Sequence, residues 1–267
     1  MELYLICEDS LEGIFTGIYE AYLMKRPHEE IHIQVGEEEN LRLFAEYRHI
    51  VPDPGKAVKV ARTIGQKFGS DGYMSVCRAL ASPDSLKGEA IYKMIVKGLL
   101  MKNPAAIMDN LANPDVLKVF ELARFCGRET HLLTGFIRFK EMDNGILYSP
   151  IGPKNNILTF LMPHFADRLP LENFVIHDEN RGLFGLHPKQ KKWYVVTEAE
   201  GFKFNPADQP CSENEAIYSE LFTMFFHTIA IEGRKNPKLH RNIMPLRYRE
   251  YMTEYERHST QLKHDNF

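Results

Sequence analysis

The chain has 267 residues, a formal net charge of −3 and four scattered cysteines, with hydrophobic residues at 44% and charged residues at 26%. This composition is typical of a folded globular protein and excludes a disordered chain or a disulfide-rich scaffold. No apolar run approaches the roughly 20 residues that a membrane helix requires. The opening residues carry acids where a signal peptide carries basic residues, so we expect a cytoplasmic protein.

The first part of the chain is predicted to combine short strands with helices. Residues 1–7 and 31–35 have the apolar, β-branched character of strands. Between them, Asp9-Ser10 offers a helix cap, and apolar residues recur at intervals of three and four until Pro27 ends the helix.

Helices are expected to dominate the next stretch. Residues 54–101 are predicted to form three helices, the last beginning at Ser82-Pro83, because proline is tolerated in the first turn. Asn113-Pro114 repeats that signal and opens a helix that should run to about Leu133.

From Gly135 onward the pattern predicts a sheet. Asp143-Asn144-Gly145 is a strong hairpin signal and separates strands expected at 136–142 and 146–151. The nearly all-apolar run at 157–162 is typical of a strand buried on both faces. Further strands are expected at 174–177, 183–186 and 193–197. Their short connections favour antiparallel pairing, because a parallel pair requires a longer crossover.

The C-terminal part is predicted to return to helices. Residues 213–231 have an apolar face at helical spacing, which we expect to be core rather than a cofactor site. The residues of that face are Ile217, Leu221, Phe222, Met224, Phe225, Phe226 and Ile229. Short helices broken at Pro237 and Pro245 should follow.

Together these elements predict an α+β fold. Residues 1–80 would form a helical N-terminal region with short strands, and residues 81–267 a core domain. That domain would hold a central antiparallel sheet of five to six strands with the C-terminal helices packed on it.

Motifs with a known mechanism are missing from the sequence. It has no phosphate-binding loop, dinucleotide fingerprint, nucleophile elbow or HExxH zinc motif, and no zinc-deaminase pattern. Neither a cofactor nor a metal is therefore predicted.

Residues 234–249, called the basic segment below, have the most one-sided charge of any stretch of the chain. They include six arginines and lysines and no acid, a pattern typical of surfaces that bind phosphate. Tyr248 would add a stacking face for an unpaired base. The alternative is a solvated helix surface that pairs with acids elsewhere, such as Glu37–Glu39.

A second set of candidates surrounds the predicted sheet. Arg138 and Lys140 would share one face of a strand, and Arg168 follows the run at 157–162. A histidine beside an acid or an arginine at a strand end serves as a general base or a phosphate clamp, although it often only caps a turn. The catalytic candidates on this basis are His131, His164, His177 and Asp178.

Three blocks of the sequence resemble one protein family. They are YLICEDSLEGIFTGIYEAY at the start, the stretch from ETHLLTGFIRF to NRGLFGLH in the middle, and FFHTIAIEGRKNPKLHRNIMPLRYREYM near the end. The family is a bacterial set of DNA metabolism or repair proteins built on domain of unknown function 4130. Cys7 and Glu8 replace the usual Tyr-Asp of the first block. Two further departures matter more: His240 replaces a usual glutamine, and Arg249 replaces a usual aromatic residue, which bears on base stacking at that position.

The resemblance implies a role in DNA metabolism without assigning catalytic residues. Relatives of the domain are fused to modules like uracil-DNA glycosylases, and members accompany a radical-SAM protein. The matching motif positions are His131, Arg138, His164, Phe165, Arg168, His177, Asp178, Arg234, Asn236, Pro237, Lys238 and Arg247.

The leading hypothesis is a protein that binds single-stranded or damaged DNA and acts with a radical-SAM partner. Nucleic-acid contacts would come from Arg138, Arg168, Arg234, Asn236, Lys238, Arg241 and Arg247. One alternative is an interaction module without chemistry, whose basic segment docks an acidic partner. The other is a hydrolase acting on a nucleotide or phosphate ester.

Overall fold

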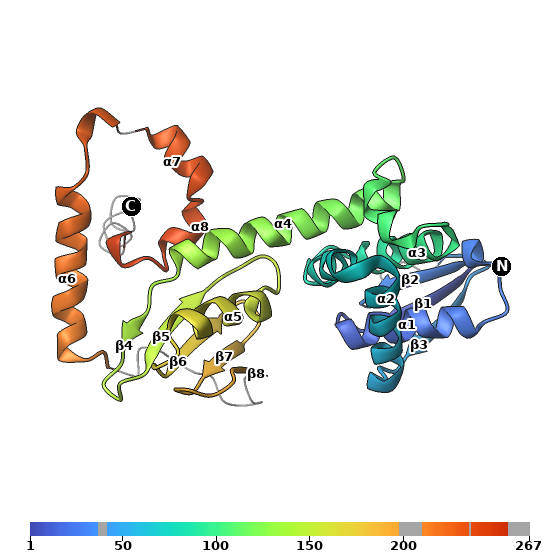
Figure 1. Ribbon diagram of the computed structural model, residues 1–267, viewed down its shortest axis with the longest axis horizontal. Coiled ribbons are helices and arrows are strands. Elements are labelled where there is room, and N and C mark those ends of the chain that lie inside the picture. Colours follow the sequence, from blue (N-terminus) through green and yellow to red (C-terminus); the bar gives the residue numbers. More distant parts are fainter. Residues whose placement is uncertain (37–41, 198–209, 235, 256–267) are drawn as a thin grey trace. The chain divides into compact units, whose positions relative to one another are not determined.

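The computed structural model describes residues 1–36, 42–197, 210–234 and 236–255 (Figure 1). The chain forms two compact units, Met1–Arg128 and Glu129–Phe267, and the division falls within helix α4 (Pro114–Phe136). The boundary predicted near residue 80 lies at the end of α2, within the first unit.

The first unit is built on a three-stranded parallel sheet. Its order is β2-β1-β3, with strands β1 (Leu3–Cys7), β2 (Ile31–Val35) and β3 (Glu46–Ile50). The predictions of the first two strands are confirmed, whereas β3 was not predicted. Helix α1 (Leu11–Leu23) connects β1 to β2, and the Ser10 side chain caps it by accepting from Gly13 N at 2.9 Å.

The helices of this unit pack closely on the sheet. A side chain at Gly17 of α1 would collide with Cys7 Sγ, so the glycine lets the helix approach β1. Only α2 (Pro54–Leu80) and α3 (Lys87–Leu100) lie where three helices were predicted. Helix α3 begins at Lys87 rather than at the predicted Ser82-Pro83, because the Ser82 hydroxyl and the Asp84 carboxylate accept backbone N–H groups of the intervening turn.

Helix α2 is kinked at Gly69. The backbone there has φ 76° and ψ −178°, a combination that residues other than glycine scarcely adopt. Where three helices were predicted over 54–101, the structure therefore has two, the first of them interrupted only by this kink.

Because of the kink, substitution of two glycines of α2 should change stability in opposite directions. Gly69→Ala should lower the free energy of unfolding by about 1–3 kcal/mol, because alanine resists that backbone conformation. Gly65→Ala is the matched control: it adds a methyl group with nothing within 4 Å at a helical position, and should raise stability by up to about 1 kcal/mol. Chemical denaturation of both variants measures the difference. Equal effects of the two substitutions would contradict a glycine requirement at 69.

The second unit contains a five-stranded mixed sheet in the order β4-β5-β6-β7-β8. The strands are β4 (Lys140–Glu141), β5 (Leu147–Ile151), β6 (Phe174–Asp178), β7 (Leu183–His187) and β8 (Tyr194–Thr197). The hairpin at residues 143–145 and the meander from β6 to β8 are confirmed. Strands β5 and β6 are parallel, so the prediction of a purely antiparallel sheet is wrong at this pair.

The prediction of a strand at 157–162 is also wrong. These residues begin helix α5 (Leu158–Arg168), which lies on the sheet and provides the crossover between β5 and β6 (Figure 1). Its buried side chains, Leu158, Leu161, Met162 and Phe165, recur at intervals of three, one and three. A short apolar run does not distinguish a buried strand from a buried helix, which explains the error.

The C-terminal helices follow the predicted breaks. They are α6 (Glu213–Thr228), η4 (Glu232–Arg234), α7 (Pro237–Ile243), α8 (Leu246–Arg249) and η5 (Thr253–Tyr255). The core prediction for the apolar face of α6 is wrong, because Ile217, Leu221 and Phe225 are each more than half exposed. Within the described ranges, no helix combines the length and apolar character needed to cross a membrane.

Candidate nucleic-acid interface

A buried carboxylate organises the surroundings of the basic segment. Glu129 is only 4% exposed, and its Oε1 accepts from the Tyr248 hydroxyl at 2.7 Å and from the Arg247 guanidinium at 3.1 Å. The same carboxylate accepts from the backbone N–H of Lys154 at 3.0 Å and of Asn155 at 2.8 Å. It therefore joins α8 and the loop after β5 to the end of α4.

These donors determine the protonation state of Glu129. Burial alone would raise the pKa of the carboxyl, but the hydrogen bonds from Lys154 N, Tyr248 and Asn155 outweigh it and hold the pKa below its usual value. The group is therefore ionised at neutral pH, as its ion pair with Arg247 requires.

A second ion pair fixes the end of the described chain. Arg138 Nη2 lies 2.8 Å from Glu254 Oε1, and its Nε lies 3.3 Å from Oε2. The Glu254 side chain is 2% exposed, so this carboxylate is buried and paired. The Arg138 guanidinium also lies over the Phe222 ring of α6, 5.7 Å from the ring centre. Arg138 and Arg247 thus position the C-terminal helices.

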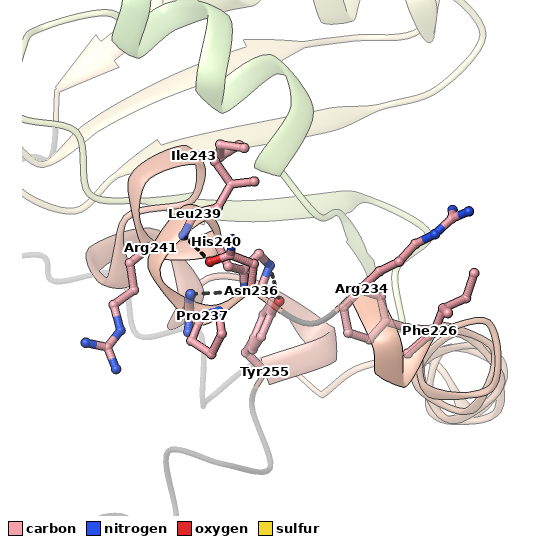
Figure 2. A pocket seen from close by; sticks show the side chains of 12 residues that line it. Phe226, Arg234, Asn236, Pro237, Leu239, His240, Arg241, Ile243 and Tyr255 are labelled. Atoms are coloured by element: carbon pink, nitrogen blue, oxygen red, sulfur yellow. Dashed lines mark hydrogen bonds between the residues drawn. The ribbon is translucent and has the colours of Figure 1, made fainter.

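The Glu129–Arg247 and Arg138–Glu254 ion pairs are called the two anchors below. Near them lies a hollow of about 710 Å³, called the basic hollow below (Figure 2). In this view Arg234 and Arg241 lie on either side of His240 and Tyr255. The lining residues come from the end of α6 and the residues after it, from η4, from α7 and the residue before it, from α8 and from η5: Phe226, Ala230, Ile231, Arg234, Asn236, Pro237, Leu239, His240, Arg241, Ile243, Arg249 and Tyr255.

Aromatic and cationic groups surround Tyr255 in the hollow. Its hydroxyl lies 3.3 Å from His240 Nε2, and the Arg249 guanidinium lies 5.2 Å from its ring centre. Phe226 meets the ring edge-on at 5.8 Å. Burial raises the pKa of Tyr255 and Arg249 opposes part of that rise, so the hydroxyl is neutral at physiological pH. Arg249 Nε is buried and has no hydrogen-bond partner in the part of the chain described.

Three other described cations of the basic segment face solvent. Arg234, Lys238 and Arg241 are exposed, and no ion pair among the described residues involves any of them. Asn236 has a local role, because its side chain caps α7 by accepting from Leu239 N at 3.0 Å. Lys235 and the acidic run Glu37–Glu39 lie outside the described residues.

The candidates around the sheet have contrasting surroundings. His177 and Asp178 are buried at the end of β6, whereas His131 on α4 and His164 and Arg168 on α5 are exposed. The structure therefore does not place the exposed histidines in the buried surroundings of His177.

The buried pair contacts residues of the neighbouring strands and of the turn after β6. His177 Nδ1 lies 2.8 Å from the Tyr148 hydroxyl, and its ring stacks on Phe184 at 4.1 Å. Burial raises the pKa of Asp178, and an ion pair with Arg181 at 3.0 Å opposes part of that rise. Within the described ranges, no three His, Cys, Asp or Glu side chains are grouped to hold a metal ion.

Comparison with known proteins gives one match. A family model described as a domain of unknown function, DUF4130, matches residues 86–254, well over half of the chain. No curated protein and no solved structure matches this chain. The matched region contains both anchors and nearly all of the basic hollow, although Tyr255 lies just beyond it.

The Glu129 anchor predicts an acid-sensitive stability. Because the pKa is lowered on folding, the stabilisation is complete well above the ordinary value of 4.5 and is lost as pH falls through the folded-state pKa. Glu129→Gln should lower the free energy of unfolding at pH 7 by about 3 kcal/mol and flatten its fall in acid. Denaturant titrations between neutral and acidic pH measure both effects.

The control for this experiment is Glu172→Gln, which changes an exposed glutamate of the same unit. That variant should keep the wild-type stability and its acid dependence. A Glu129→Gln protein as stable as wild type at pH 7 would show that the anchor contributes nothing.

Proposed function

We propose that this protein, which belongs to the DUF4130 family, binds nucleic acid at the basic hollow. The observation that carries the proposal is the set of three exposed cations, Arg234, Lys238 and Arg241, beside a hollow that holds Tyr255 and His240. Arg138 and Arg247 are left out of the interface because they are engaged with buried carboxylates.

The two kinds of residue suit two parts of a nucleic acid. Exposed arginines and lysines contact phosphates, which gives affinity without reading sequence. Aromatic rings stack on unpaired bases, with about 1–3 kcal/mol for each base. A volume of about 710 Å³ lies within the usual range for small-ligand pockets, so a nucleotide fits by size. An accessible base is needed, which favours a single strand or a damaged duplex.

The resemblance described above supplies the biological setting of the proposal. It favours DNA rather than RNA, a role in bacterial DNA metabolism or repair in the cytoplasm, and joint action with a radical-SAM protein. Arg168, exposed at the end of α5, remains a further candidate contact.

An interaction module is the second candidate function. It is favoured by the exposed apolar face of α6 and by the net charge of −3, which is unusual for a free-standing nucleic-acid binder. In that case the exposed cations would meet an acidic protein.

Charge reversal separates these two functions. The triple variant Arg234→Glu, Lys238→Glu and Arg241→Glu should lose most of its affinity for labelled single-stranded DNA. Because each phosphate contact contributes about 0.7 to the salt slope on a single strand, the slope should fall by about 2. Binding titrations over a salt series, with single-stranded, duplex and abasic DNA, give both quantities.

The matched control reverses three exposed lysines of the β7–β8 turn, Lys189, Lys191 and Lys192. Equal losses in both triple variants would indicate only a general effect of net charge. Absence of DNA binding by the wild-type protein at low salt would disprove the proposal.

Removing the aromatic ring tests the stacking contact. Tyr255→Ala should weaken single-stranded binding by about 1–3 kcal/mol and leave the salt slope unchanged. Tyr255→Phe keeps the ring and should retain most of the affinity. If Tyr255→Phe weakened binding as much as Tyr255→Ala, the hydroxyl rather than the ring would be the recognition element.

A further inference from the structure

Helices α1, α2 and α3 of the first unit meet around a hollow of about 210 Å³, called the apolar hollow below. Each helix contributes two hydrophobic side chains to its lining: Ile18 and Tyr22, Val60 and Ile64, and Ile95 and Leu99. Thr63 also lines it, but its hydroxyl is engaged within α2, where it donates to Lys59 O at 2.9 Å. The apolar hollow therefore offers few hydrogen bonds to an occupant.

The helices around the apolar hollow carry an excess of positive charge. Residues 54–70, which run to the kink of α2, and residues 90–100 of α3 together contain six lysines and arginines and no acid. Stretches of one charge create a local potential that attracts groups of the opposite sign. An occupant that approaches along these two helices is therefore expected to be acidic.

Acids that adjoin these stretches are already paired. Glu20, the only acid of residues 13–28, and Asp53 at the start of α2 lie 2.6 and 3.8 Å from Lys56 Nζ. Glu89 Oε1 lies 2.8 Å from His32 Nδ1. These pairs leave the remaining lysines and arginines of α2 for a partner.

Two of those cations lie beside the apolar hollow. Lys59, Thr63 and Lys67 follow one another at intervals of four, so they share the side of α2 on which Lys59 and Thr63 line the hollow. All three side chains are exposed. In the described part of the chain, no ion pair involves Lys59 or Lys67.

We propose that the apolar hollow binds an acidic segment of another protein. One apolar side chain of that segment enters the hollow, and its carboxylates pair with Lys59 and Lys67 on the same side of α2. Amphipathic segments bind hydrophobic grooves in this way, with apolar side chains as anchors. The charges would speed the encounter and fix the orientation of the segment.

The size of the apolar hollow and its ring contacts favour a side chain over a nucleotide. Its volume lies below the range of about 300–1,000 Å³ that is usual for small-ligand pockets. Lys59 Nζ lies 5.3 Å from the Tyr19 ring centre, and the Tyr22 ring lies 4.6 Å from His28. A base would have to compete with these contacts. A hollow also suits an inserted side chain better than the flat surface of a bilayer.

This proposal is independent of nucleic-acid binding at the basic hollow, because the two sites share no residue. Reversal of Lys59 and Lys67 should leave the affinity for single-stranded DNA unchanged. The triple reversal of Arg234, Lys238 and Arg241 should likewise leave peptide binding unchanged. Failure of one proposal is thus distinguishable from failure of the other.

Fluorescence anisotropy of the full-length protein with short labelled peptides tests the acidic segment. Each peptide carries one central leucine or phenylalanine among glutamates. Wild type should bind at least one of them, and the double variant Lys59→Glu and Lys67→Glu should weaken binding at least about tenfold. The matched control reverses Lys189 and Lys191, two exposed lysines of the second unit, and should bind as wild type does. Replacing the central side chain of the peptide by aspartate should abolish binding.

Filling the apolar hollow tests the anchor. Thr63→Phe adds a ring at an exposed position that lines the hollow, and should abolish peptide binding. Gln66→Phe adds the same ring at an exposed position of α2 outside the lining, and should leave binding unchanged. Circular dichroism should show both variants folded, because both native side chains are exposed. If Thr63→Phe proved unfolded, the reversal of Lys59 and Lys67 would decide.

A wild-type protein that binds none of the peptides at low salt overturns the proposal. So does peptide binding that survives either the lysine reversal or Thr63→Phe in a folded protein, because the contact would then lie elsewhere. Single-stranded DNA and vesicles of phosphatidylcholine with phosphatidylserine serve as competing probes. If Lys59 and Lys67 were needed to bind one of these and not the peptides, the surface would recognise phosphate rather than an acidic protein.

Discussion

The Glu129 carboxylate is the interaction on which the second unit depends. It is buried, ionised and surrounded by donors from two segments far away in the chain. A buried charge of this kind is stable only while all its partners are present, so its burial demands that the loop after β5 and helix α8 occupy fixed positions. The positions of Arg249, at the end of α8, and of Tyr255, which follows α8, are set by this requirement and by the Arg138–Glu254 pair.

Local signals in the sequence predicted the elements that local chemistry determines. Ser10 caps a helix and Pro237 opens one, and the hairpin at Gly145 has the positive φ that its sequence indicates. The prediction of a strand at 157–162 was wrong because the helical or extended state of these residues depends on their packing against β6 and β7. Once that run is a helix, the parallel pairing of β5 and β6 follows.

The candidate interface was predictable in composition but less so in detail. The basic segment pointed to Arg234, Lys238 and Arg241, yet its charge alone did not separate them from Arg247. Only the tertiary fold shows that Arg247 has a buried carboxylate as partner. Both Glu129 and Tyr255 were missed: Glu129 opens the middle block without any local chemical signal, and Tyr255 lies beyond the last block. The role of Glu129 arises from contacts across more than a hundred residues, and that of Tyr255 from a hollow formed by several helices.

The long-range pair between Arg138 and Glu254 has a consequence for biosynthesis. Its partners are 116 residues apart, and a ribosome releases the chain from its N-terminus. All five strands of the sheet are synthesised before Glu254, so at that stage Arg138 of a nascent chain has no carboxylate to meet. The surface beside Tyr255 is thus among the last parts of the described chain to form, and a polypeptide clipped before α8 would also leave the Glu129 carboxylate without its donors Arg247 and Tyr248.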